Sequence, residues 1–452
     1  MKFFPFQKSL GMILVVGALL VSIPPAFATE KVWTPKKAVI FALNHSPDSK
    51  IALQRINQSA ALLEKNKSFY LPRVDVSAAY SQTDNPMYSF GNILNQGSFD
   101  NSIDFNDPGN TDNLGFKAEL KYQIYNGGRN GASVDMAESI LNSSRISRTE
   151  TEHLLGYQVV HAFMMILQAQ EQQHARKSQL EAINSSLQVA KARYEAGDLL
   201  KTDVLNFEVE RSSARENVII SEHQLNLANQ VFLNLLGLEE ESVTIDTTDS
   251  FSQNIPNNDS VVTRPKLQAL KAQLNAAAAA QKITESKRFP TLDGFANYQL
   301  DYSLMDDGSG DSWAAGLRLN YNLYNGNETG AELAMKRAEY QKLKESYEKA
   351  RLALNLDLEK ARINYSQAEQ RKQVTQHMVN LAMESAQLSR ERFKEGVILA
   401  SDLIDVEVRL TDALVRQSSA NANYQIAIAN LRRASGLQQF APTTAELLEN
   451  QK

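Results

Sequence analysis

The sequence predicts a mixed α and β membrane protein, in which each chain gives four strands to an oligomeric β-barrel that long helices continue. Three observations predict this fold class: an export signal at the amino terminus, an internal duplication, and four segments that alternate apolar and polar side chains. The 452 residues are also enough for a sizeable core.

The amino terminus has the features of a secretory signal peptide. Two lysines precede an apolar run from about residue 10 to residue 23, and Ala26-Phe27-Ala28 supplies the small-x-small pattern of a cleavage site. The run is too short to span a bilayer, which takes about 20 residues. We therefore predict that residues 1–28 are removed from the mature protein.

Charge and cysteine content exclude several classes of protein. The formal net charge is -5 for the whole chain and becomes -7 without the two signal lysines, which argues against a nucleic-acid or anionic-lipid binder. Cysteine is absent, so there is no disulfide framework, no thiolate metal site and no lipid-anchoring cysteine.

The mature chain contains the same pattern twice. The segment RYEAG at 193–197 matches RFKEG at 392–396, and Gly237 matches Gly436, each pair being 199 residues apart. Residues further upstream match at a larger offset of 218, as Tyr80 matches Tyr298. The first copy therefore carries about 19 extra residues between Tyr80 and Leu120. The duplication predicts two structural repeats, which span 29–263 and 264–452.

Each repeat contains a predicted pair of strands, within about 69–126 and about 289–325. Their side chains alternate with period two, as Val74, Val76 and Ala78 do with the polar residues between them. Polar stretches at 84–113 and 305–312 predict the connecting loops.

Strands of about ten residues with one apolar and one charged face suit a transmembrane barrel. For a single hairpin, a half-solvated sheet of a soluble domain is the simpler interpretation, but four such strands behind a signal peptide favour the barrel. Because even small barrels need about eight strands, four cannot close alone. The chain must therefore oligomerise.

The remaining residues predict helices. No proline interrupts 131–195 or 329–395, and about 65 residues at 1.5 Å each give rods near 100 Å long. Return helices of about 35 residues end at the two glycines named above, and shorter helices are expected at 36–68 and 264–287. Rods of this length need helical neighbours, and a solvated coiled coil is the alternative to a tunnel wall.

A repeated glycine-rich turn raises the question of a cofactor. The segments YQIYNGGRNGA at 122–132 and YNLYNGNETGA at 321–331 each follow a strand and precede a helix. Asn126 stands where a dinucleotide fingerprint needs its first glycine, and neither copy ends as a P-loop does. We therefore interpret both turns as junctions where a strand becomes a helix, and an enzyme built on them is a lesser alternative.

Other signals of catalysis are equally weak. The six histidines are scattered without ligand spacing, and no G-x-S-x-G occurs. We predict no enzymatic activity, no catalytic residues, no metal site and no cofactor.

One acidic pair supports a functional hypothesis. Asp402 and Asp405 are three residues apart at the start of the second return helix, so they share one face. If three chains assembled around an axis, six carboxylates would ring a constriction and attract cations. The alternative is that Asp402 caps its helix, as Asp203 would in the first repeat.

Taken together, these motifs make the chain resemble the TolC-type outer-membrane efflux proteins, also called outer membrane factors. The resemblance covers the mature chain: two copies of strand, loop, strand, long helix, R-[YF]-x-x-G turn, [TS]-D-[VL] and return helix. It implies a homotrimer with a 12-stranded β-barrel, four strands per chain, continued by a long α-helical periplasmic barrel. It places the protein in the outer membrane, with a large periplasmic portion.

The same resemblance implies a function and partners. The protein would be the passive exit duct of a tripartite efflux or type I secretion system, which engages an inner-membrane pump and a periplasmic adaptor and contacts outer-membrane lipid but no nucleic acid. The alternative is a periplasmic coiled-coil structural or adaptor protein without a membrane barrel.

Several residues match functional positions of that family. Asp402 and Asp405 match the aspartates that constrict the channel entrance. The turns from Gly197 to Leu199 and from Gly396 to Ile398 match the tips that adaptors contact.

The family's entrance latch is altered in this sequence. Asp203 matches an acid that pairs with an arginine to hold the entrance closed, but Ile398 occupies the arginine's place and Phe393 that of a latch tyrosine. Lys201 or Arg392 could substitute, and the sequence does not choose between them.

Overall fold

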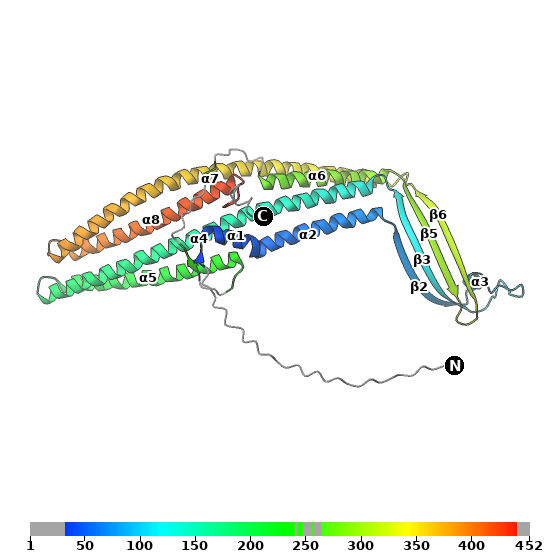
Figure 1. The fold of residues 1–452 in the computed structure, drawn as a ribbon, viewed down its shortest axis with the longest axis horizontal. Helices are drawn as coiled ribbons and strands as arrows, with labels where there is room; N and C mark the ends of the chain where they lie inside the picture. Colours follow the sequence, from blue (N-terminus) through cyan, green and yellow to red (C-terminus); the bar gives the residue numbers. More distant parts are fainter. Residues whose placement is uncertain (1–31, 240–242, 247–254, 257–263, 441–452) are drawn as a thin grey trace, which may run out of the picture.

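The computed structural model describes residues 32–239, 243–246, 255–256 and 264–440. The predicted signal peptide lies outside the described residues. The molecule is elongated, with a four-stranded sheet at one end and two helical tips at the other (Figure 1).

The sheet joins the two repeats edge to edge. Its antiparallel strands are β2 (Arg73–Thr83), β3 (Thr111–Tyr125), β5 (Thr291–Tyr302) and β6 (Ser309–Asn320), in the order β2-β3-β5-β6. At the junction between the repeats, Ala118 of β3 lies opposite Tyr298 of β5. Within the described residues, β2 and β6 have no strand on their outer edges.

Two helices of 67 residues each run from the sheet to the tips, α4 (Arg129–Glu195) and α7 (Glu328–Lys394). Each is followed by a return helix, α5 (Lys201–Leu236) or α8 (Ala400–Ala434), which pairs with it over the tip half (Figure 1). From residue 354 onward, buried residues on α7 recur at intervals of three, four and seven, the spacing of a coiled-coil seam. They are Leu354, Leu358, Ala361, Ala368, Thr375, Val379, Ala386 and Phe393.

Shorter helices cover the long ones on the sheet side. They are α1 (Pro35–His45), α2 (Pro47–Lys67) and α6 (Pro265–Glu285), with the one-turn helices η1 (Ser68–Tyr70) and η2 (Ser286–Arg288) leading into the strands. Strands β1 (Val32–Trp33) and β4 (Thr244–Ile245) pair in parallel beside α1. Trp33 packs edge-on against Phe232 of α5, with 6.0 Å between the ring centroids, in the largest apolar core.

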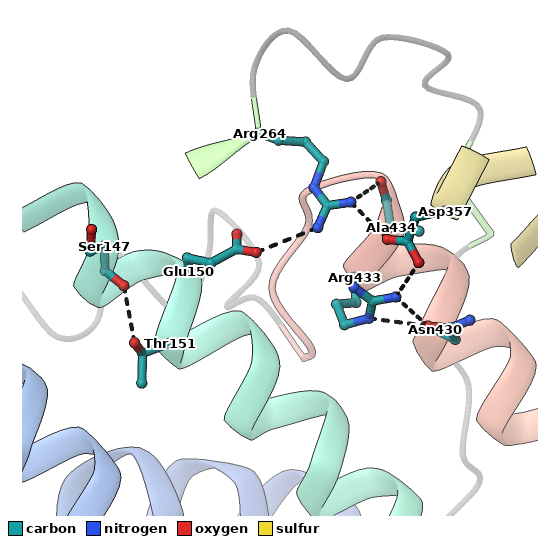
Figure 2. A network of polar contacts seen from close by, with 8 residues as sticks. All are labelled: Ser147, Glu150, Thr151, Arg264, Asp357, Asn430, Arg433 and Ala434. Atoms are coloured by element: carbon teal, nitrogen blue, oxygen red, sulfur yellow. Dashed lines mark hydrogen bonds and ion pairs between the residues drawn. The ribbon is translucent and has the colours of Figure 1, made fainter. Parts of the chain in front are cut away.

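A buried arginine fixes the point where four helices meet. Arg264 precedes α6, and its guanidinium bonds Asp357 of α7 at 3.0 Å and the carbonyl oxygen of Ala434 at 3.2 Å (Figure 2). Glu150 of α4 lies 3.5 Å from the same group, and Arg433 binds the other oxygen of Asp357 at 2.9 Å. Because a buried charge needs partners, this network ties the second repeat's helices to α4.

Three predicted elements differ from the observed ones. The helix expected at 36–68 is interrupted at Ser46, because Pro47 has no N–H to continue the first helix. The loop expected at 84–113 contains α3 (Pro86–Asn95), which Asn85 caps by accepting a hydrogen bond from the N–H of Met87 at 3.2 Å. The loop expected at 305–312 is shorter than predicted because β6 already begins at Ser309, and β6 ends at Asn320, before the predicted end of the strand pair at about 325.

The glycine-rich turns form strand-to-helix junctions. Gly127 and Gly326 both have φ of +66°, in the left-handed region that glycine occupies readily. The next residue is also left-handed in each copy, Gly128 in the first and Asn327 in the second. Asparagine tolerates that region better than most residues, which explains the substitution between the repeats.

Candidate functional site at the paired helical tips

The two helical tips have the same backbone geometry. Gly197 and Gly396 adopt φ of +85° and +79°, and each ends its long helix. The N–H of the following residue, Asp198 or Val397, donates to the carbonyl oxygen of Arg193 or Arg392 at 2.8 Å. This six-to-one bond with a left-handed glycine is a Schellman motif, so both tips require glycine for the same reason.

A shared apolar cluster holds the two tips together. We call it the tip cluster; its buried members are Ile183, Leu187, Ala190, Val204, Phe207, Phe393, Ala400 and Leu403, with Leu199 and Ile398 packed against them half-buried. Phe393 is only 1% exposed, and its ring centroid lies 5.5 Å from that of Phe207 on α5. The structure thus brings together three of the residues singled out in the sequence: Leu199, Ile398 and Phe393.

Arg193 links the end of α4 to the end of α7. Its Nη1 donates a hydrogen bond to the carbonyl oxygen of Phe393 at 2.8 Å, and its guanidinium carbon lies 5.3 Å from the centroid of the Phe393 ring. A Cβ at Gly396 would lie 3.0 Å from Nη2 of the same arginine, so that glycine also makes room for it. The sequence shows Arg193 as part of a repeated motif, but gives no sign of this cross-repeat contact.

The acidic residues lie just beyond the tips, at the starts of the return helices. Asp402 accepts a hydrogen bond from the N–H of Leu399 at 3.4 Å, and Asp203 accepts one from Leu200 at 3.4 Å. Both therefore make the first-turn capping contact that was the alternative interpretation. Asp405 is exposed, with its Oδ2 3.9 Å from Arg409 one turn on.

One chain does not gather these acids into a ring. Asp402 and Asp405 are exposed on α8. Among the contacts of the described residues, Asp203 has no arginine partner of the kind that holds the family's entrance closed. The constriction formed by several chains stays a prediction.

An ion pair behind each tip binds the long helix to its return helix. Arg390 of α7 and Glu407 of α8 form a two-armed pair, and at the equivalent positions Lys191 of α4 lies 3.0 Å from Glu208 of α5. The hydrogen bond that Arg390 donates to Glu407 raises the pKa of Arg390, although burial acts in the opposite direction. The hydrogen bond and charge of Lys191 lower the pKa of Glu208.

Exposed leucines cap both tips. Leu200 and Leu399, equivalent in the two repeats, are 70% and 68% exposed, and Val397 is exposed beside Leu399. Neither leucine was predicted as a site residue from the sequence, although their repetition at the 199-residue offset was a usable signal. Both tips therefore expose apolar side chains to solvent in the single chain.

Within the described ranges, no helix has both the length and the apolar character needed to cross a membrane. The same part of the chain contains no group of three or more His, Asp or Glu side chains placed to hold a metal ion.

The sequence is similar to those of outer membrane efflux proteins. The family model described as "Outer membrane efflux protein" matches residues 41–238 and 258–437. The outer membrane efflux protein BepC of Brucella suis is 25% identical over 258 residues, and the match covers 55% of this chain and 54% of that protein, about half its length. The outer membrane protein TolC of Vibrio cholerae is 22% identical over 433 residues, which are 92% of this chain and 94% of that one.

A solved structure gives the same fold. The CmeC outer membrane channel of Campylobacter jejuni superposes with a TM-score of 0.77 at 14% identity, covering 99% of this chain and 98% of that one. The predicted fold class is therefore confirmed: the chain, with its four-stranded sheet and the paired long helices of two repeats, shares the fold of that channel over nearly its whole length.

Proposed function

The chain belongs to the outer membrane efflux protein family, and on that basis we propose that three copies form one passive exit duct through the outer membrane and across the periplasm. The duct serves a tripartite efflux or type I secretion system. A pump in the inner membrane supplies the energy, and a periplasmic adaptor joins the pump to the helical tips.

The observation that carries this proposal is the open sheet. Strands β2 and β6 form its two edges, and the duplication makes each equivalent to a strand that is paired inside the sheet, β2 to β5 and β6 to β3. An unpaired edge in lipid leaves backbone polar groups without partners, which only closure of the barrel avoids. Three chains give 12 strands when β6 of each pairs with β2 of the next.

The helices support the same closure. Within the chain α4 packs against α8 of the other repeat, so the duplication pairs α7 with α5 of the next copy. Both of those helices carry rows of exposed apolar side chains that need cover. On α7 they are Leu352, Leu356, Ile363, Val374, Leu381 and Leu388; on α5 they are Leu205, Val209, Ile220, Leu227 and Val231.

For the tips, we propose contact with the adaptor. The turns at Gly197 to Leu199 and Gly396 to Ile398 place the exposed leucines Leu200 and Leu399 at the far end of the helical half. Six such tips in a trimer form a crown of apolar side chains. An adaptor hairpin with a matching apolar end would cover it.

The test is conductance together with oligomeric state. Detergent-purified mature protein should run as a heat-sensitive trimer and form pores in planar bilayers, with no added nucleotide. A monomer that stays dissolved without detergent and forms no pores would instead support the periplasmic coiled-coil alternative. For the adaptor, Leu200→Asp with Leu399→Asp should leave the pore intact and abolish export in cells; Ser212→Asp, on an exposed turn of α5, is the control.

A further inference from the structure

We propose that Arg392 forms a second clasp between neighbouring subunits, binding the Tyr194 ring and carbonyl oxygen of the next copy as Arg193 binds Phe393 within the chain. This inference rests on the proposed trimer and adds a specific contact at its entrance. The partner is a second copy of this chain.

The internal clasp supplies the geometry. Arg193 reaches from the last turn of α4 to the last turn of α7, where it donates to the Phe393 carbonyl at 2.8 Å and lies over the Phe393 ring. A charge-assisted hydrogen bond and a cation–π contact then act together on one residue. The clasp joins the tip of repeat 1 to the tip of repeat 2.

The duplication supplies the residues of the second clasp. At the offset of 199 residues, Arg193 corresponds to Arg392 and Phe393 corresponds to Tyr194. Both arginines are four residues before a left-handed glycine, and their carbonyl oxygens accept the same 2.8 Å bond. The two side chains therefore leave superimposable backbones.

The two equivalent aromatic residues differ in how exposed they are in the single chain. Phe393 is 1% exposed because repeat 1 covers it, whereas its equivalent Tyr194 is 45% exposed and Arg392 is exposed beside its own tip. When a duplicated chain closes into a ring, each inter-repeat contact within a chain recurs between chains. In that ring repeat 2 of one copy meets repeat 1 of the next, which brings Arg392 to Tyr194.

The chemistry of the second pair is as good as that of the first. Tyrosine offers the same aromatic face as phenylalanine and the same main-chain carbonyl, and arginine provides several donors in a planar group. The closed ring would then have six arginine clasps, three within chains and three between them. The clasps between chains are the ones that an opening of the entrance would have to break.

Because the natural chain has no cysteine, paired cysteines test the contact directly. Arg392→Cys with Tyr194→Cys, treated in outer-membrane fractions with a short bis-maleimide, should give covalent dimers and trimers on a denaturing gel. The matched control is Lys394→Cys with Tyr194→Cys, since Lys394 is also exposed but lies two residues on, toward the other side of α7. It should remain monomeric.

A second pair tests the trimer independently. Gln172 of α4 bonds Ser419 of α8 at 3.0 Å, and the equivalent residues are Arg371 of α7 and Ile220 of the next copy's α5. If Arg371→Cys with Ile220→Cys forms oligomers while the Arg392 and Tyr194 pair does not, the clasp is wrong and the duct proposal stands. If neither pair links and the protein is monomeric, both fail.

A loss-of-contact variant gives a readout without cross-linking. Arg392→Ala should lower the temperature at which the trimer dissociates on heating. Arg392→Lys keeps a donor but not the planar group, so its dissociation temperature should lie between those of Arg392→Ala and the natural protein. Lys394→Ala should leave that temperature unchanged. An Arg392→Ala trimer as heat-resistant as the natural one would overturn the proposal.

Discussion

Glu407 of α8 is 2% exposed in its side chain and receives two hydrogen bonds from Arg390 of α7, one of them 2.7 Å long. Arg390 itself is 41% exposed, so the carboxylate depends on the arginine far more than the arginine depends on the carboxylate. The equivalent pair in repeat 1, Lys191 and Glu208, is open to water on both sides.

This difference predicts that removing the basic side chain lowers the free energy of unfolding more in repeat 2 than in repeat 1. Arg390→Ala leaves a buried, uncompensated carboxylate and should destabilise the helical half by about 3 kcal/mol. Lys191→Ala breaks an exposed pair and should cost at most about 1 kcal/mol. The check is the midpoint of urea unfolding followed by circular dichroism at the helix band; equal shifts for the two variants would show that Glu407 finds other partners.

The duplication also predicts the register in which the barrel closes. Ala118 lies opposite Tyr298 between the repeats, so Leu317 of β6 should lie opposite Tyr80 of the next copy's β2. Opposed residues in an antiparallel pair have Cβ atoms about 5 Å apart, within reach of a disulfide after small adjustment. Leu317→Cys with Tyr80→Cys should therefore form oxidised trimers in the outer membrane.

The control for the register is a slip of one residue. Leu317→Cys with Ser81→Cys places the two sulfurs on opposite faces of the sheet, because neighbouring strand residues point to opposite sides. That pair should stay reduced under the same oxidant. A disulfide in the slipped pair and none in the predicted one would mean that the subunits join in another register than the repeats do.

A buried histidine predicts a loss of stability in mild acid. Burial lowers the pKa of His153 on α4, and Arg264 adds to this, while Glu150 and Glu152 partly oppose it. A histidine with a lowered folded-state pKa contributes stability above its ordinary pKa, near 6.5, and that stability is lost as pH falls toward the folded value. The thermal midpoint should therefore begin to fall below about pH 6.5.

Substitution identifies the histidine responsible. Burial also lowers the pKa of His161, so His153→Gln should reduce the fall of the thermal midpoint between pH 7 and pH 5 without removing it. His377→Gln, at an exposed position of α7, should leave the profile as in the natural protein. If the two variants have the same pH profile, the acid sensitivity arises elsewhere.

Much of this fold could be predicted because it depends on periodicity. Alternation of period two marked the strands, the absence of proline marked the long helices, and α4 and α7 begin within two residues of the predicted starts at 131 and 329. Short elements escaped because composition averages over them: α3 lies within a stretch rich in Asn, Gly and Ser, and only Asn85 followed by Pro86 signals its start.

The site was harder to predict because side-chain contacts between repeats have no local pattern. The sequence showed Arg193 and Arg392 as equals and gave Phe393 only the place of a missing latch tyrosine. In the structure Arg193 makes the clasp and Phe393 is its buried target. Whether Phe393 or its equivalent Tyr194 is covered depends on how the two repeats pack against each other, and only the tertiary fold determines that packing.

The two aspartates at the start of α8 should form a cation-binding ring in the assembled trimer. If three copies bring Asp402 and Asp405 around one axis, six carboxylates bind multivalent cations together, and Asp402→Ala with Asp405→Ala should raise the half-blocking cation concentration at least about tenfold, which is 1.4 kcal/mol. The measurement is block of single pores in a planar bilayer. Asp203→Ala is the control, because Asp203 makes the same 3.4 Å capping contact but Asn206 replaces the second acid. If that control weakens the block as much as the double variant does, the effect comes from loss of the helix cap, and the ring hypothesis is wrong.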